Sequence, residues 1–142
     1  MTSDIICIDA SFIVRLLSSQ PIATPFFGLW NQWQNLGYRI VAPTLIRYEV
    51  SNAFHRSALA GQIPPEEASE ALQDALNLNI ILYGDSELHR QALNIATQLK
   101  LPATYDAHYL ALAQQLGCEF WTADKRLFNA VQATLSWVNL VQ

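Results

Sequence analysis

Short, continuous apolar runs constrain the fold of this chain more than any other feature of its sequence. The first run, Ile5-Ile6-Cys7-Ile8, is rich in β-branched residues and is followed at once by Asp9. An unbroken apolar run of this length is typical of a strand buried on both faces of a parallel sheet. Further short strands are predicted at residues 39–42, 80–83, 119–122 and, as a fifth, 137–140.

Segments with the residue spacing of amphipathic helices separate these runs. One of them carries Phe26, Phe27, Trp30 and Trp33 and ends at Gly37. Because helices alternate with strands, the sequence predicts an α/β fold with a mainly parallel central sheet of four to five strands, in one domain over residues 1–142. Helices are predicted at about residues 11–17, 25–36, 43–60, from 64 onward, 85–100, 105–116 and directly after 124.

The composition supports a globular domain. With 142 residues, of which 51% are hydrophobic, the chain has enough apolar surface for a sizeable core. No stretch is long enough to span a bilayer and the amino terminus lacks the basic start of a signal peptide, so we expect a cytoplasmic protein with no membrane partner. Cys7 and Cys118 are too few for a disulfide framework, and we expect both to be buried apolar residues.

The formal net charge of −4 weighs against nucleic acid as a partner, because nucleic-acid-binding proteins usually present a basic surface. The four acids considered next carry −4 by themselves, which leaves the rest of the chain formally neutral. If cations neutralise these four acids, the acidic balance no longer excludes a polyanion. In that case, the acidic net charge predicts that a polyanion binds weakly when no metal is present.

Two acids directly follow predicted strands. Asp9 lies just past the first strand and Asp124 just past the fourth. Ligands of parallel α/β sheets bind outside the carboxyl ends of the strands, so both side chains are expected at that edge if the two strands are neighbours. Each acid also precedes a predicted helix. Capping of that helix is an equally good explanation, and it is compatible with metal binding.

Two further acids lie on apolar faces of predicted helices. Glu49 falls within or at the edge of a buried stripe, where an unpaired carboxylate costs several kcal/mol. Its alternative to metal binding is a salt bridge with Arg15, Arg47 or Arg56. Asp106 lies in the first turn of its helix and above an apolar stripe. A favourable interaction with the helix N-terminus explains why an acid lies in the first turn, but it does not explain why the acid lies above an apolar stripe.

Convergence of these four carboxylates in one pocket has a definite chemical consequence. Like charges raise one another's pKa values, so such a pocket is unfavourable without a cation. Hard divalent cations such as Mg²⁺ and Mn²⁺ reverse this effect, because they prefer oxygen ligands and often keep some of their waters. Bound in this way, they activate a water, orient a phosphate and stabilise the departing oxygen. The pattern therefore favours hydrolysis of phosphodiester bonds.

Four pieces of the sequence resemble the PIN-domain family, and specifically the small VapC-type toxin ribonucleases of type II toxin–antitoxin pairs. They are ICIDAS at 6–11, LIRYEV at 45–50, YDAHYLALA at 105–113 and FWTADKRL at 120–127. Each piece alone is a weak signal. All four together, in order and on the expected elements, cover nearly the whole chain and are specific. The resemblance implies a three-layer α/β/α fold.

The resemblance also implies roles for individual residues and for partners. Ser11 and Thr122 match hydroxyl positions beside the site, with ordinary capping or a strand-end hydrogen bond as the alternative. The family implies Mg²⁺- or Mn²⁺-dependent hydrolysis of RNA by an activated water, a homodimer, and a cognate antitoxin whose tail occupies the active-site groove. The catalytic and metal-binding acids of the family match Asp9, Glu49, Asp106 and Asp124.

Other residues are weaker candidates. Arg15, Lys125 and Arg126 are candidates for phosphate contacts near the acids, although basic residues are sparse. The three histidines are scattered and are not assigned to catalysis. The aromatic stripe at 26–33 is expected to be core, and a partly exposed stripe would instead indicate a protein partner.

Two other functions remain open from the sequence. One is a non-catalytic PIN scaffold that binds a protein or RNA partner, although such a protein has no physical need for four mutually repelling carboxylates. The other is a different α/β phosphohydrolase with Asp9 as a nucleophile. Enzymes of that haloacid-dehalogenase-like kind usually have a second aspartate two residues later, where this chain has Ser11.

Overall fold

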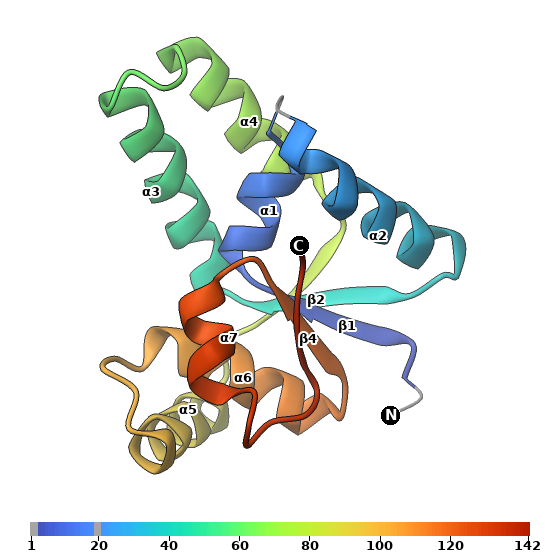
Figure 1. Ribbon diagram of the computed structural model, residues 1–142, viewed down its shortest axis with the longest axis vertical. Helices are drawn as coiled ribbons and strands as arrows, with labels where there is room; N and C mark the ends of the chain where they lie inside the picture. Colours follow the sequence, from blue (N-terminus) through green and yellow to red (C-terminus); the bar gives the residue numbers. More distant parts are fainter. Residues whose placement is uncertain (1–2, 19–20) are drawn as a thin grey trace.

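The computed structural model describes residues 3–18 and 21–142, and its centre is a five-stranded sheet (Figure 1). The order across the sheet is β3-β2-β1-β4-β5, and every neighbouring pair is parallel. The predicted α/β fold with a parallel sheet is confirmed. The strands are β1 (Ile5–Ile8), β2 (Arg39–Pro43), β3 (Ile80–Tyr83), β4 (Glu119–Thr122) and β5 (Val138–Leu140).

The central position of β1 follows from its apolar sequence. The last three residues of this strand are at most 3% exposed. In the parallel register, Cys7 lies between Val41 of β2 and Phe120 of β4. The carboxyl ends of β1 and β4 are therefore adjacent, and this adjacency brings Asp9 and Asp124 to the same edge of the sheet.

Helices cover both faces of the sheet and complete the predicted three layers (Figure 1). The helices are α1 (Ala10–Leu16), α2 (Thr24–Asn35), α3 (Leu45–Leu59), α4 (Pro65–Asn77), α5 (Ser86–Leu99), α6 (Tyr105–Leu116) and α7 (Lys125–Val131), with a short 3-10 turn, η1 (Pro21–Ala23), before α2. The first four helices pack on one side. On the other side, α6 packs against β1, β2 and β4, and α5 packs on α6, while α7 lies beside β5.

The aromatic stripe of α2 belongs mainly to the core. Phe26 and Trp33 are 2% and 4% exposed, and their ring centroids lie 5.1 and 5.5 Å from that of Phe12 in α1. Trp30 is half-buried, whereas Phe27 faces solvent. The expectation of core is confirmed for Phe26 and Trp33 and is wrong for Phe27, which lies one residue off the buried face of the helix.

Both cysteines are buried and free, as expected. In the part of the chain that the structure covers, no helix combines the length and the apolar character needed to cross a membrane.

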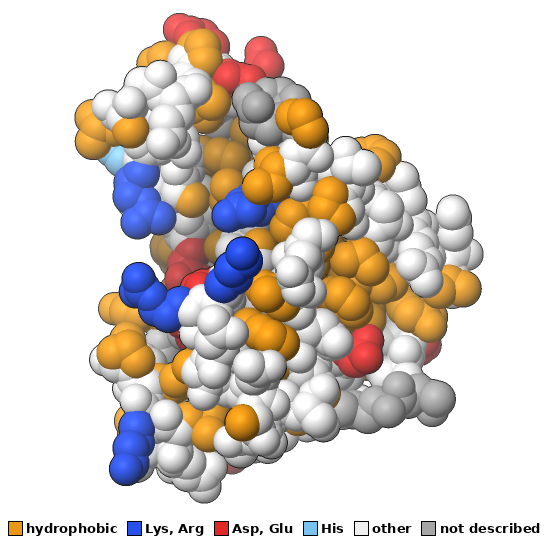
Figure 2. Space-filling model, in the orientation of Figure 1, with side chains coloured by type: hydrophobic (Ala, Val, Ile, Leu, Met, Phe, Trp, Pro, Cys, Tyr) orange, Lys and Arg blue, Asp and Glu red, His pale blue; other side chains and the backbone are white. Residues whose placement is uncertain are grey.

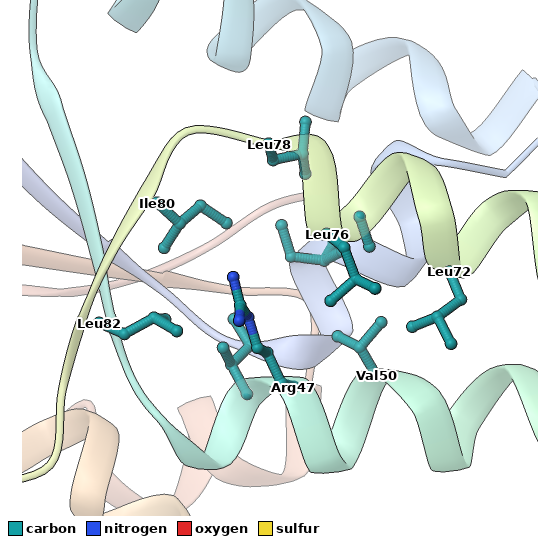
Figure 3. Close-up of a pocket in the computed structure, with 10 residues that line it drawn as sticks. Arg47, Val50, Leu72, Leu76, Leu78, Ile80 and Leu82 are labelled. Atoms are coloured by element: carbon teal, nitrogen blue, oxygen red, sulfur yellow. The ribbon is translucent and has the colours of Figure 1, made fainter.

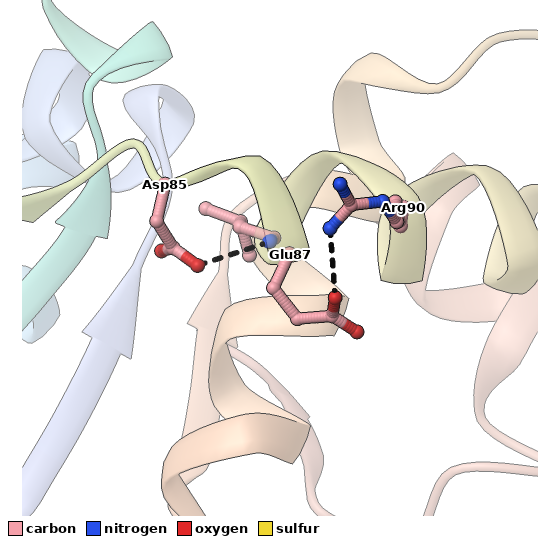
Figure 4. Close-up of polar contacts among 4 residues, drawn as sticks. Asp85, Glu87 and Arg90 are labelled. Carbon is pink, nitrogen blue, oxygen red and sulfur yellow. Dashed lines mark hydrogen bonds and ion pairs between the residues drawn. The ribbon is translucent and has the colours of Figure 1, made fainter.

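Polar contacts fix the start of α5, where Asp85 is the N-cap residue. Its Oδ2 accepts a hydrogen bond from the backbone N–H of Leu88 at 3.3 Å (Figure 4). Nearby, the guanidinium of Arg90 pairs with the carboxylate of Glu87 at 3.0 Å, and both side chains are exposed. Contacts of this local, exposed kind stabilise a helix end by modest amounts.

The start of α3 differs from the prediction that Pro43 opens this helix. Pro43 ends β2 opposite Tyr83 of β3, and the helix begins at Leu45. The backbone N–H of Thr44 donates to the carbonyl oxygen of Tyr83 at 2.8 Å, which continues the contact between the strands past the proline. Proline is compatible with this place because its fixed φ also suits the end of an extended segment.

Candidate active site

The four predicted acids line one cavity at the carboxyl edge of the sheet, with a volume of about 320 Å³. Each acid comes from a different part of the fold: Asp9 joins β1 to α1, Glu49 lies in α3, Asp106 in α6, and Asp124 joins β4 to α7. In Figure 2, acidic side chains lie in a hollow of the surface that basic side chains flank. The fold thus brings together residues that are far apart in sequence.

Asp9 is the most firmly held of the four acids. It is 6% exposed, and each of its oxygens accepts a hydrogen bond from a hydroxyl group. Ser11 Oγ donates to Oδ1 at 2.6 Å and Thr122 Oγ1 donates to Oδ2 at 2.5 Å. Oδ1 also accepts from the backbone N–H of Phe12 at 3.0 Å, so Asp9 caps α1 as well. The capping explanation and a place in the acidic cavity therefore coexist.

Ser11 and Thr122 connect the two strand ends that carry Asp9 and Asp124. Ser11 Oγ accepts a hydrogen bond from the backbone N–H of Ala123 at 3.0 Å. Thr122 Oγ1 accepts one from the backbone N–H of Asp124, also at 3.0 Å. Because both hydroxyls donate to Asp9, their place in the structure is that of support for a carboxylate.

Burial and charge shift the protonation of two acids. Burial raises the pKa of Asp9 to about 6, although its three hydrogen bonds act in the opposite direction, and the charge of Asp106 adds to the rise. Burial also raises the pKa of Asp106 to about 6, with further contributions from the charges of Asp124 and Glu49. The carboxylates therefore lie close enough to repel one another.

Glu49 has a partner that the sequence analysis did not identify. The hydroxyl of Tyr109 in α6 donates a hydrogen bond to Glu49 Oε1 at 2.5 Å. Tyr109 lies three residues after Asp106, on the same side of the helix, and it lines the same cavity. That spacing, together with the need of a buried tyrosine hydroxyl for a partner, was the available signal.

A salt bridge from a nearby arginine, the alternative proposed for Glu49, is absent among the described residues. The ion pairs found in residues 3–18 and 21–142 join Arg39 to Asp4 and Arg90 to Glu87, and neither involves the acidic cavity. Arg47 instead lines a separate, mainly aliphatic pocket between α3, α4 and β3 (Figure 3). Within residues 3–18 and 21–142, the cavity acids thus form no ion pair with a cationic side chain.

The donor set of the cavity fits a hard divalent cation. All four candidate ligands are carboxylates, and Mg²⁺ and Mn²⁺ prefer such oxygens. Nowhere in the described ranges do three His, Cys, Asp or Glu side chains stand close enough to hold a metal ion as they are. Mg²⁺ keeps several waters and is usually held directly by one or two carboxylates, so it does not require three side chains in direct contact with it.

Basic residues lie beside the acids. Arg15 lines the acidic cavity, and so does Arg56, which the sequence analysis did not propose as a phosphate contact. Lys125 and Arg126 line a neighbouring cavity of about 950 Å³ that shares Ser11, Arg15 and Asp124 with the first. The three predicted phosphate contacts therefore lie next to the acids, and Arg56 adds a fourth candidate.

The histidines do not line the acidic cavity. His108 Nδ1 donates to the carbonyl oxygen of Thr104 at 2.6 Å, and its Nε2 lies 2.9 Å from His89 Nδ1. His55 is exposed on α3.

Comparison with known proteins identifies the family. The PIN domain family matches residues 6–133. The VapC ribonuclease Mb0985 of Mycobacterium bovis and the ribonuclease VapC9 of Mycobacterium tuberculosis are each 32% identical over 95 residues, which cover 67% of this chain and 72% of the relative.

Solved structures agree at the level of the fold. PAE2754 from Pyrobaculum aerophilum superposes with a TM-score of 0.69 at 23% identity, covering 95% of this chain and 83% of that one. VapC20 of Mycobacterium tuberculosis, a sarcin-ricin loop cleaving toxin, superposes with a TM-score of 0.63 at 16% identity, covering 89% and 95%. The sheet order and the acidic cavity at its carboxyl edge agree with this likeness. Because the family matches residues 6–133, the chain belongs to the PIN-domain family.

Proposed function

We propose that this protein is an Mg²⁺- or Mn²⁺-dependent endoribonuclease, and that it is the toxin of a type II toxin–antitoxin system. The observation that carries the proposal is the cavity lined by four carboxylates, which have no cationic side chain paired with them among the described residues. Membership of the PIN family and relatives named VapC ribonucleases support RNA as the substrate.

The proposed metal ligands are the four acids. When bound there, a divalent cation supplies an activated water and stabilises the charge that develops on the phosphate. Ser11 and Thr122 hold the Asp9 carboxylate in one orientation through a hydroxyl on each of its oxygens. Fixed orientation of a ligand lowers the cost of reaching the reactive geometry. The proposed ligands are Asp9, Glu49, Asp106 and Asp124.

The basic residues are proposed to bind the substrate backbone. Arg15 lies at the boundary between the acidic cavity and its neighbour, and Lys125 and Arg126 lie in the neighbouring cavity. Guanidinium and ammonium groups bind phosphates through charge-assisted hydrogen bonds. An RNA strand that places one phosphate at the acids can therefore place an adjacent one against these cations.

The remaining proposals concern the cellular setting. We propose a cytoplasmic protein that acts as one domain over residues 1–142, forms a homodimer and is inhibited by a cognate antitoxin. Relatives named VapC ribonucleases support the cognate antitoxin as a partner.

Neither alternative function is favoured by a specific observation. For the haloacid-dehalogenase-like alternative, the position two residues after Asp9 holds Ser11 instead of a second aspartate, and the Ser11 hydroxyl donates to Asp9 Oδ1. A scaffold that only binds a partner has no need for several acids that repel one another, and this repulsion contributes to the raised pKa of Asp106.

The test is cleavage of RNA by the purified chain with and without Mg²⁺ or Mn²⁺. Asp106→Asn removes one ligand charge and is expected to lower the rate by at least ~100-fold, because one lost metal ligand weakens both cation binding and charge stabilisation. Asp74→Asn, at an exposed acid of α4, is the matched control and should cleave like the wild type. Equal cleavage by Asp106→Asn, or cleavage that survives complete removal of metal, would contradict the proposal.

A further inference from the structure

The hydrogen bond between Tyr109 and Glu49 stands out among the contacts of the acidic cavity. It joins two helices across 60 residues of sequence, from α6 to α3, with an O···O distance of 2.5 Å. Tyr109 is 1% exposed and is the largest of the fully buried side chains. Its hydroxyl is therefore the polar end of a core residue, directed at a proposed metal ligand.

The ring of Tyr109 is fixed by packing. It stacks on Phe120 of β4, with the ring centroids 6.0 Å apart and the planes at 29°. A tyrosine side chain has two torsions, and burial of the ring leaves its hydroxyl in one place. Glu49 is half-buried and has three torsions, so without a partner its carboxylate can adopt several positions.

The hydroxyl of Tyr109 is the donor in this contact. A tyrosine hydroxyl carries one proton that it can donate, and its oxygen lies 2.5 Å from Glu49 Oε1, a carboxylate oxygen that accepts. Within residues 3–18 and 21–142, the bond to Glu49 reaches Oε1 alone and leaves Oε2 available.

We propose that Tyr109 is a positioning residue, which holds Glu49 by Oε1 so that Oε2 is presented to a divalent cation or to a water bound to that cation. This inference rests on the proposed function. It also gives α6 two roles, because Asp106 and Tyr109 lie three residues apart on this helix. One supplies a ligand directly, and the other orients a ligand on α3.

The test is binding of Mn²⁺ to the whole chain, measured by calorimetry on the wild type and on Tyr109→Phe. This variant keeps the ring and removes only the hydroxyl. Loss of a group that orients a metal ligand typically weakens metal binding 10- to 100-fold, so we expect an increase of at least ~10-fold in Kd. Tyr38→Phe, at a tyrosine that lines a different cavity, is the matched control and should bind like the wild type.

A cycle with Glu49→Gln separates positioning from general damage to the core. If Tyr109 acts through Glu49, the double variant Tyr109→Phe/Glu49→Gln binds Mn²⁺ no more weakly than Glu49→Gln alone. A purely structural role predicts that the two losses add, or that Tyr109→Phe lowers stability and leaves Kd unchanged. Either result would overturn the inference.

A second measurement does not depend on any variant folding. In the wild type, proton NMR should show a slowly exchanging, downfield hydroxyl proton for Tyr109, which shifts when Mg²⁺ is added. A signal that stays fixed while other resonances of the cavity move would overturn the positioning role but leave the proposed function intact. Failure of the wild type to bind Mn²⁺ or Mg²⁺ at all would instead remove the proposed function, and the inference with it.

Discussion

At the Asp9 carboxylate, burial and hydrogen bonding act in opposite directions. Three hydrogen bonds favour its charged form, yet burial dominates, and its pKa rises from 3.8 to about 6. The pKa of Asp106 rises to a similar value, because burial and repulsion from the charges of Asp124 and Glu49 act in the same direction. The metal-free protein therefore carries electrostatic strain that is confined to a few side chains.

The strain predicts a specific pH dependence of stability. Both acids bind a proton more tightly in the folded protein than in the unfolded chain, so folding takes up protons between about pH 4 and pH 6. The free energy of unfolding of the metal-free protein should therefore fall as the pH rises through this range, with Asp9 contributing on the order of 2 kcal/mol. Urea unfolding in the presence of a chelator measures this fall.

Asp106→Asn is the internal control for this pH dependence. It removes one of the two titrating groups and relieves repulsion, so its stability should fall less than that of the wild type between pH 4 and pH 6. Saturating Mg²⁺ at pH 7 should raise the stability of the wild type more than that of the variant. Parallel pH profiles of stability for the two proteins would contradict a raised pKa at Asp106.

The hydroxyl of Thr122 provides a second prediction for a single residue. Thr122→Val keeps the β-branched shape in a fully buried position but removes the donor to Asp9 and the acceptor for the Asp124 N–H. Leaving these buried groups unpaired should cost about 1–3 kcal/mol in urea unfolding at pH 7. Thr97→Val, where an exposed hydroxyl bonds to the Leu93 carbonyl within α5, should change stability by less than ~1 kcal/mol. Equal effects of the two substitutions would contradict this role of Thr122.

At the scale of elements, the strands and most helices follow from local sequence. The apolar runs predict β1, β3 and β4 at their observed bounds, because burial in a parallel sheet needs an uninterrupted apolar sequence. The error at Pro43 arises where two local preferences compete, since proline suits both a helix start and a strand end. Pairing with β3, 40 residues later in the chain, decides between them.

The candidate site was predictable in part for the same reason. Asp9 and Asp124 follow strands, so their edge of the sheet could be inferred, although their adjacency depended on the strand order. Spacing along α6 places Tyr109 on the same side as Asp106, but its pairing with Glu49 in particular depends on how α6 and α3 approach each other in the fold. Motifs locate the acids, whereas tertiary packing selects the residues that orient them.

Two of the left-handed helix ends allow a prediction at this scale. α5 ends at Lys100 and α6 at Gly117, with φ angles of 55° and 64°. Glycine adopts this conformation readily, whereas other residues adopt it at a cost in free energy. Lys100→Gly should therefore stabilise the protein by up to ~1 kcal/mol, and Gly117→Ala should destabilise it by about 1 kcal/mol. A Cβ at Gly117 meets nothing within 4 Å, so the cost comes from the backbone alone.

Thermal unfolding of these two variants checks the prediction. Gly28→Ala is the control, because this glycine lies inside α2 with open space around it, and alanine should stabilise the helix by ~0.5–1 kcal/mol. Destabilisation by Lys100→Gly would show that the end of α5 is held by contacts other than backbone conformation.

For the whole molecule, the distribution of charge matters more than its sum. The chain has 8 Lys and Arg residues, and four of them, Arg15, Arg56, Lys125 and Arg126, line the acidic cavity or its neighbour. The net charge of −4 therefore conceals a basic border around an acidic centre (Figure 2). A polyanion can approach this border once cations occupy the centre.

This border predicts the salt dependence of RNA binding. Lys125→Ala/Arg126→Ala should weaken binding of a single-stranded RNA and reduce the slope of log K against log salt by roughly 1, while the rate at saturating RNA changes little. Arg39→Ala/Lys100→Ala removes the same charge away from both cavities and should leave the slope unchanged. Equal slopes for the two double variants would place the RNA elsewhere on the surface.

The strand order also has a consequence for how the protein is made. The first acid is at residue 9, but its partner Thr122 lies 113 residues later, at the end of β4, and Asp124 follows that strand. β4 pairs directly with β1. A ribosome-bound fragment that stops before residue 119 lacks this strand and cannot assemble the cavity. A growing chain therefore cannot form the site that would cut nearby transcripts until β4 has been synthesised and has paired with β1.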